Sequence, residues 1–181
     1  MAHTSQEPER RLENRAGAWA LAVADRIGRR VVATAGGEAE AAALISLRIY
    51  DGATIERLRH IAGLSHPGAV RLVDRLEAEG LVERGPGRDA RSVALHLTDA
   101  GRGRAAEALA ERERALEELL APLGVEERAQ LGALLDTLLG ALPADRRDLE
   151  SICRLCDYRA CDGNLLGVCP VDRAVIAHET R

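Results

Sequence analysis

The sequence predicts a mainly α-helical fold that contains one small β-hairpin. Apolar residues recur at the three- and four-residue spacing of amphipathic helices over most of the chain. Alanine, leucine and arginine dominate the composition, and all 25 basic residues are arginines, which is typical of a helix-rich protein. Two short apolar segments flank the sequence Gly-Pro-Gly-Arg-Asp, which predicts a hairpin turn.

A first group of three helices is predicted before residue 63. Glycines and capping residues bound them: Gly36 follows the first helix, Gly52 follows the second, and Thr54 is the N-cap expected for the third. The expected ranges are residues 10–32, 38–49 and 54–62.

The fourth helix has the clearest boundaries. Ser65 is its expected N-cap, Pro67 lies in the first turn, where its missing N–H costs nothing, and Gly80 is the expected stop. Two short strands, at residues 81–83 and 92–97, then flank the predicted turn. The order of helix, short helix, turn, capped helix and hairpin predicts a winged helix-turn-helix.

Two long helices and one short helix are expected after the hairpin. Thr98 caps a helix that reaches about Ala121, and Gly124 begins another that ends near Leu142. Their leucine faces are larger than one small domain can cover, so a second copy of the chain is expected to pack against them. Pro143 opens a short helix that reaches the first cysteines, and the other cysteines are expected in a loop.

This arrangement resembles the MarR family (multiple antibiotic resistance regulators) over about residues 10 to 142. The matching text is GLSHPGAVRLVDRLEAEGLVER and RGPGRDARSVALHLTDAGR, with the family's Asp-x-Arg wing motif at residues 89–91 and its Leu-Thr-x-x-Gly motif at 97–101. The resemblance implies a cytoplasmic homodimer that binds double-stranded DNA and regulates transcription, usually as a repressor. The expected parts are an N-terminal dimerisation helix (8–35), the winged helix-turn-helix DNA-binding domain (38–98), long dimerisation helices (99–142) and a C-terminal extension (143–181).

DNA-contacting residues are expected in the fourth helix and in the wing. The start of the fourth helix can enter a major groove, and Arg71 is the candidate for a bidentate contact with guanine. Arg91 is expected to reach into the minor groove, with Asp89 orienting it. Arg75, Arg84 and Arg88 are expected near phosphates. The complete expected set is Ser65, His66, Gly68, Val70, Arg71, Arg75, Arg84, Arg88, Asp89 and Arg91.

The resemblance also implies a small-molecule effector, often a lipophilic acid, between the dimerisation helices and the winged helix. Trp19, Arg48 and Tyr50 are candidates to line its pocket, although Trp19 also fits a core position and Arg48 a surface position. The net charge is −4 at pH 7, so any DNA-binding face must be a local concentration of positive charge. No apolar run is long enough to cross a membrane. No catalytic motif is present, and we expect no enzyme.

The four cysteines, Cys153, Cys156, Cys161 and Cys169, all lie in the extension, outside the resemblance. Cytoplasmic thiols stay reduced, so such a cluster favours metal or redox chemistry over disulfides. Their spacing suits either an iron-sulfur cluster or Zn²⁺. The Cys-Pro ending at Cys169 resembles bacterial ferredoxin motifs and favours the cluster. A zinc clamp and a metal-free thiol switch remain alternatives, with Asp157 and His178 as substitute ligands.

Two functions therefore follow from the sequence. The first is a DNA-binding regulator whose four-cysteine site is a redox- or metal-responsive element, which reorders the extension against the dimerisation helices. The second is an iron-sulfur or zinc protein that transfers electrons or binds a partner protein, and that uses the winged helix only as a protein-binding scaffold.

Overall fold

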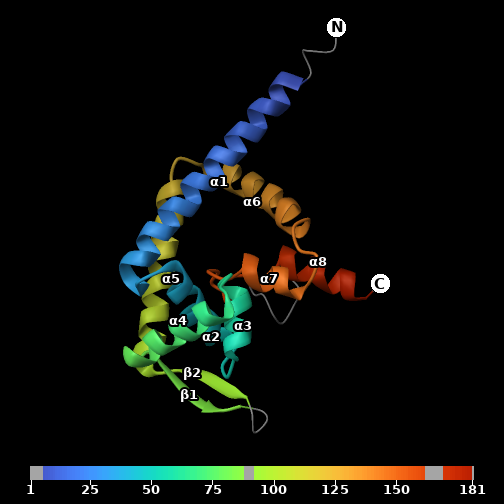
Figure 1. Cartoon of the computed structure of the whole chain (residues 1–181). Coiled ribbons are helices and arrows are strands. Elements are labelled where there is room, and N and C mark those ends of the chain that lie inside the picture. The colour runs from blue at the N-terminus through green and yellow to red at the C-terminus, as the bar shows by residue number, and fades with distance from the viewer. Residues whose placement is uncertain (1–5, 88–91, 162–168, 181) are drawn as a thin grey trace.

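The computed structural model describes residues 6–87, 92–161 and 169–180. Long helices form a narrow upper part of the molecule, and the winged-helix region and the C-terminal helices lie below it (Figure 1). The elements are α1 (Gln6–Ala35), α2 (Glu38–Ile49), α3 (Ile55–Ile61), α4 (His66–Ala78), β1 (Val82–Pro86), β2 (Val93–Leu97), α5 (Asp99–Leu120), α6 (Val125–Gly140), α7 (Arg146–Ile152) and α8 (Pro170–Glu179). The predicted mainly α fold with a small hairpin is confirmed.

Hydroxyl side chains start three helices of the winged-helix region, as the sequence predicts. Thr54 caps α3, Ser65 caps α4 and Thr98 caps α5. Each side-chain oxygen accepts a hydrogen bond from a backbone N–H in the first turn, at 3.2, 3.3 and 3.0 Å respectively. Gly80 follows α4 with a φ of 68°, a left-handed conformation that favours glycine.

Replacing Thr98 with alanine is expected to lower the free energy of unfolding by about 1 kcal/mol. Besides accepting the cap hydrogen bond, the Thr98 hydroxyl donates to the Gly80 carbonyl at 2.6 Å, so it ties the start of α5 to the end of α4. Urea denaturation measures the change. Thr137→Ala is the control, because its hydroxyl bonds only to Ala133 of its own helix, and should cost less than about 0.5 kcal/mol. Equal losses in the two variants would contradict this role of Thr98.

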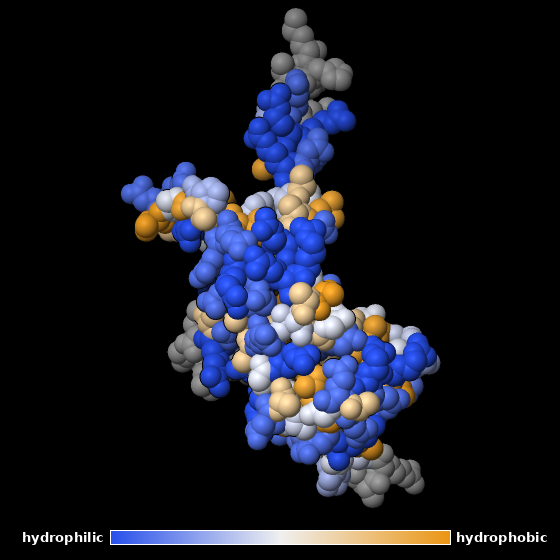
Figure 2. Space-filling model, turned by 90° about the vertical axis from the view of Figure 1, so that its left-hand side faces the viewer, coloured by the Kyte–Doolittle hydropathy of each residue, from blue (hydrophilic) through white to orange (hydrophobic). Residues whose placement is uncertain are grey.

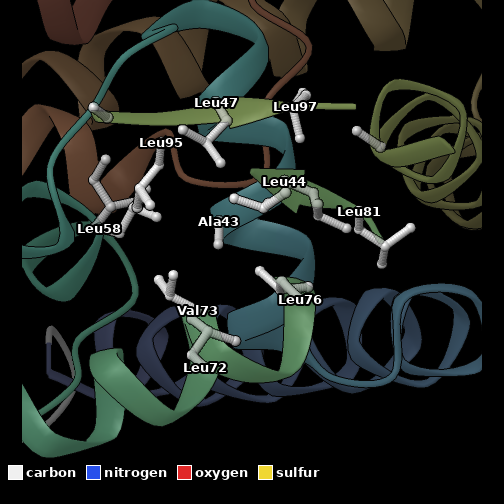
Figure 3. Close-up of a cluster of buried hydrophobic side chains, with 14 residues drawn as sticks. Ala43, Leu44, Leu47, Leu58, Leu72, Val73, Leu76, Leu81, Leu95 and Leu97 are labelled. Atoms are coloured by element: carbon white, nitrogen blue, oxygen red, sulfur yellow. The ribbon is translucent and has the colours of Figure 1, made fainter. Parts of the chain in front are cut away.

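The core of the winged-helix region forms where α2, α3, α4 and the hairpin meet. Leu44 and Leu47 of α2 pack in one cluster with Leu76 of α4 and Leu95 of β2 (Figure 3). Leu58 of α3 closes one side of this cluster. Each of these leucines is at most 1% exposed, so α2 is the central helix against which α3, α4 and the hairpin are positioned.

The hairpin is longer than its apolar pattern predicts. β1 and β2 pair antiparallel from Val82 opposite Leu97 to Pro86 opposite Val93. The expected first strand ended at residue 83, and Gly85 and Pro86 were assigned to the turn. A two-stranded sheet has only edge strands, where a proline without an N–H is tolerated, so β1 continues to Pro86.

Helix α1 packs along α5, and ion pairs cross between them. Arg26 and Arg30 of α1 both reach Glu118 of α5, at 2.9 and 2.6 Å. α1 begins at residue 6 rather than 10 and ends at 35 rather than 32. Its first turns are exposed, and apolar periodicity cannot detect a helical turn that contacts nothing.

Helix α6 has no buried residue in the single chain, although five large apolar side chains are exposed on it or beside its end. Leu134 and Leu138 are each 62% exposed. Helix α1 adds exposed Leu12, Trp19 and Leu21. Apolar residues are visible in the narrow upper part of the molecule, among charged ones (Figure 2). The large exposed apolar faces predicted from the sequence are therefore present on these helices.

The C-terminal extension differs from the prediction in two respects. α7 begins at Arg146, with Asp145 as its N-cap, instead of at Pro143, because the Asp145 carboxylate accepts from two backbone N–H groups of the first turn. Cys169 does not lie within a loop but is the N-cap of α8, whose first residue is Pro170. Val171 and Val175 of α8 are buried, so this helix forms part of a packed structure.

Candidate functional site

The start of α4 presents the predicted major-groove residues at the surface. Ser65, His66 and Arg71 are exposed, and Gly68 and Val70 are partly buried. A Cβ at Gly68 would lie 3.2 Å from the Ser65 Oγ, so the glycine leaves the N-cap hydrogen bond unobstructed. Arg71 makes no ion pair with the residues that the structure describes. A capped helix start and an available arginine suit entry into a DNA groove.

Two of the expected phosphate-contacting arginines are paired with carboxylates. Arg75 lies 2.5 Å from Glu40 of α2. Arg84 of β1 lies 2.6 Å from Asp74 and also pairs with Glu77, both of α4. These contacts hold α4 against α2 and against the wing, so both arginines position the expected DNA-reading helix. Their phosphate contacts stay predictions.

The remaining wing residues of the expected set, Arg88, Asp89 and Arg91, lie outside the described residues. The described part of the wing is anchored to the winged-helix region at its base. Ala53, in the turn between α2 and α3, forms a bridge with Leu95 of β2, and the Gly52 N–H donates to the Leu95 carbonyl at 3.0 Å. The turn between α2 and α3 and the wing therefore form one connected unit.

All four cysteines line one small cavity of about 20 Å³. They come from three segments: Cys153 ends α7, Cys156 and Cys161 follow it, and Cys169 starts α8. Their role as metal ligands stays a prediction. The other lining residues are Tyr50, Arg146, Leu149, Tyr158 and Asp172.

The cavity is small: its volume of about 20 Å³ accommodates roughly one water-sized species. Cys161 is the exposed member of the four cysteines. Among the described residues, no three His, Cys, Asp or Glu side chains are arranged closely enough to hold a metal ion. The four thiols therefore share a cavity but would have to close around a metal.

The thiols influence one another's pKa values. A hydrogen bond with Cys153, helped by the positive charges of Arg112 and Arg154, lowers the pKa of Cys156 to about 6 despite its burial. The same hydrogen bond, together with burial, raises the pKa of Cys153. Burial raises the pKa of Cys161. Cys156 therefore carries thiolate character near neutral pH, the form that binds soft metals.

Residues from the winged-helix region form part of the cavity wall. Tyr50, the C-cap of α2, lines the cavity, and the Arg57 guanidinium of α3 lies over its ring at 3.6 Å. Arg57 also pairs with Glu150 of α7 at 2.6 Å. Burial, and then the negative charge of Glu150, raise the pKa of the Tyr50 phenol. No sequence pattern predicts this contact, because Arg57 and Glu150 are far apart in the chain.

Four lining residues, Arg146, Leu149, Tyr158 and Asp172, were missed as site residues, and one expected substitute ligand does not line the cavity. Asp172 is 8% exposed and lines the cavity, and burial raises the pKa of Tyr158 to about 12. Asp172 lies one turn before Val175 in an apolar pattern that was not interpreted as a helix. His178 lies next to the Ala144 carbonyl and does not line the cavity.

The three candidate effector-pocket residues do not share a cavity. Arg48 lines a separate cavity of about 230 Å³ together with Leu109, Cys156 and Tyr158. Tyr50 lines the cysteine cavity, and Trp19 lines neither of them. Trp19 is 43% exposed on α1, so the core position also considered for it is wrong for the single chain.

The described part of the chain contains no helix with both the length and the apolar character needed to cross a bilayer. The MarR family profile matches residues 38–92. No curated protein sequence matches the chain.

Solved structures with the same fold include the YusO protein from Bacillus subtilis, at 21% identity and a TM-score of 0.63, covering 78% of this chain and 99% of that one. The apo form of MarR from E. coli has 26% identity and a TM-score of 0.59, with coverage of 68% and 95%. A mutant MarR from E. coli complexed with operator DNA has 26% identity and a TM-score of 0.54, with coverage of 68% and 92%. Residues 38–92 thus match the MarR family profile, and the chain shares its winged-helix fold with solved MarR-type regulators.

Proposed function

We propose that this protein is a DNA-binding transcription regulator, acting as a repressor, and that α4 reads the operator. The observation that carries the proposal is the start of α4: it is capped, exposed, bears an available arginine and is fixed beside the wing by Arg84. A helix start of this kind fits a major groove. The solved complex of a mutant E. coli MarR with operator DNA supports the same use of the fold here.

The proposed regulator acts as a homodimer. The exposed leucines of α6 and the apolar residues of α1 need a partner surface, and a second copy of the same helices provides a self-complementary one. Two-fold symmetry then places two α4 helices on one face of DNA. The expected operator is pseudo-palindromic, with half-sites about one helical turn apart.

The cysteine cavity is proposed as a metal centre of this regulator. Four thiols line it, and the pKa of one of them is low enough for a thiolate, the form that binds Zn²⁺. The thiols would have to move closer together to hold the ion. An iron-sulfur cluster, favoured by the Cys-Pro sequence, is the alternative. In either form, binding or loss of the metal would change the order of the extension and so the DNA affinity.

The proposed function is tested by selecting DNA from a random-sequence library with the full chain. Enrichment of a pseudo-palindrome whose affinity falls steeply with salt is expected. Recovery of unrelated sequences, or of no DNA, would contradict the proposal and leave the protein-binding scaffold as the better explanation of the winged helix.

Replacing Arg71 with alanine is expected to cost about 1 to 3 kcal/mol of binding free energy and to relax the preference for one base pair in each half-site. Arg91→Ala, in the expected minor-groove contact, should cost a similar amount. Arg29→Ala removes the same charge from the exposed face of α1 and is the control. Fluorescence anisotropy with the selected operator measures all three. Equal affinity of Arg71→Ala and Arg29→Ala would show that α4 does not read DNA.

A further inference from the structure

The C-terminal extension contacts both the winged-helix region and α6. We call its described residues, 146–161 and 169–180, the brace. α7 packs against α3 of the winged helix, and α8 packs against α6 (Figure 1). α7 and α8 also contact each other, and the cysteine cavity lies between them. The brace therefore spans from the DNA-binding region to a helix that we propose as part of the dimer.

The packing of α7 on α3 includes an ion pair between Glu150 and Arg57, and Arg154 of the brace also pairs with Glu38 of α2. The Glu150 side chain is 10% exposed and lies 2.6 Å from the Arg57 guanidinium, whose other contact is the ring of Tyr50. Within the described part of the chain, the Arg57 Nε is buried and has no hydrogen-bond partner. A buried N–H without a hydrogen-bond partner destabilises the packing of α7 against α3. This packing therefore depends on Glu150 being held beside Arg57.

The position of Glu150 is linked directly to the cysteines. Cys153 lies one turn after Glu150 and is the C-cap of α7, and its N–H donates to the Leu149 carbonyl at 2.9 Å. Leu149 and Tyr50 line the cavity with the thiols. A metal that draws Cys153 toward the other thiols would therefore move or fix the turn that carries Glu150.

The other end of the brace is linked to the cysteines in the same way. Cys169 caps α8, and Val171 and Val175 of that helix are buried in one cluster with Leu149. Leu139 of α6 packs against this cluster. Cys169 is itself 8% exposed and belongs to the same cluster. Closure of the four thiols would join the α6 end of the brace to the α3 end.

The contact between Glu150 and Arg57 is connected through α3 and the preceding turn to α4 and the wing, the elements expected to contact DNA. Tyr50 ends α2, and the short turn after it leads to Thr54, the N-cap of α3. Within that turn Ala53 pairs with Leu95 of the wing, and α3 packs against α4. A shift of α3 would therefore change the placement of α4 and the wing together.

We propose that metal loading of the cysteine cavity is transmitted to the winged helix through the contact between Glu150 and Arg57, and that it fixes α3 relative to α6. This inference rests on the proposed metal centre and states how metal binding there would act on the winged helix. It differs from the route expected from the sequence, in which the extension acts only on the dimerisation helices. Direct contact with α3 lets each chain respond by itself.

The first test is hydrogen-deuterium exchange of the full chain without DNA. Metal-depleted protein is compared with the same protein reconstituted anaerobically with Zn²⁺ in one arm, and with iron and sulfide in the other. Slower exchange in α3 is expected in the arm that loads the site, by about 5- to 150-fold. Glu150→Gln should bind the same amount of metal but lose most of this difference. Glu118→Gln, which breaks the ion pairs of Glu118 with Arg26 and Arg30 with the same change in charge, should keep it.

The second test is the operator affinity of the same samples. Wild type and Glu118→Gln should show an affinity that differs between loaded and depleted protein by about 5- to 150-fold, and Glu150→Gln should show a ratio near one. Equal exchange of α3 in loaded and depleted wild type would overturn the inference, and so would an unchanged ratio in Glu150→Gln. A response of α3 in protein that binds no selected DNA would support the brace and overturn the proposed function.

Discussion

Replacing Leu138 with glutamate is expected to convert the proposed dimer into monomers and to weaken operator binding at least about 100-fold. Leu138 is 62% exposed on α6, a helix without a buried residue in the single chain. In a two-fold dimer the substitution would bury two carboxylates without partners, at a cost of roughly 3 kcal/mol or more. Sedimentation velocity measures the loss of the dimer, and anisotropy with the selected operator measures the loss of affinity.

Ala133→Glu is the matched control for this prediction. It introduces the same charge on the same exposed helix, about 140° around the helix axis from Leu138. This variant should remain dimeric. A dimer that survives Leu138→Glu would place the interface elsewhere, and loss of helical circular dichroism in Leu138→Glu would show that this leucine is needed for the fold of the single chain.

Cys153→Ala is expected to abolish stable metal binding and with it the response of DNA affinity to metal. Removing a residue that only hydrogen-bonds to a metal ligand typically weakens metal binding 10- to 100-fold. Removing one of the four thiols themselves should weaken it more. Cys153 is also the thiol nearest in sequence to Glu150, so its loss cuts the link to Arg57. Metal analysis and operator binding, with and without added metal, measure the two effects.

His178→Ala is the control for the cysteine substitution. His178 was the substitute ligand expected from the sequence, but it does not line the cavity, so its removal should leave metal content unchanged. Full metal content in Cys153→Ala would contradict the four-thiol site. A parallel loss of metal in His178→Ala would show that the ligand set includes this histidine.

Local signals in the sequence predicted the DNA-binding half of the fold. Caps at Thr54, Ser65 and Thr98 are short-range hydrogen bonds whose partners lie three residues away, so sequence spacing is enough to find them. The strand that reaches Pro86 was missed, because proline argues against a strand except at an edge, and the edge position is visible only in three dimensions.

The extension was harder to predict, because its contacts are long-range. The four thiols are close in sequence, and their spacing was enough to group them. Two ion pairs illustrate this: Arg57 with Glu150, and Arg75 with Glu40. The partners lie on different helices, so no helical or strand periodicity relates them. Charged residues on helices usually face solvent, so nothing in the sequence distinguishes these pairs from solvated side chains.

The metal content of the native protein is the most direct test of the proposed metal-responsive regulator. The full chain would be purified without oxygen, and its absorption spectrum recorded together with iron, acid-labile sulfide and zinc per chain. We predict either one zinc per chain in a colourless protein, or matched iron and sulfide in a coloured protein that air bleaches. A protein that contains neither metal and whose four thiols are all free would contradict the proposed centre and the route from it to α3.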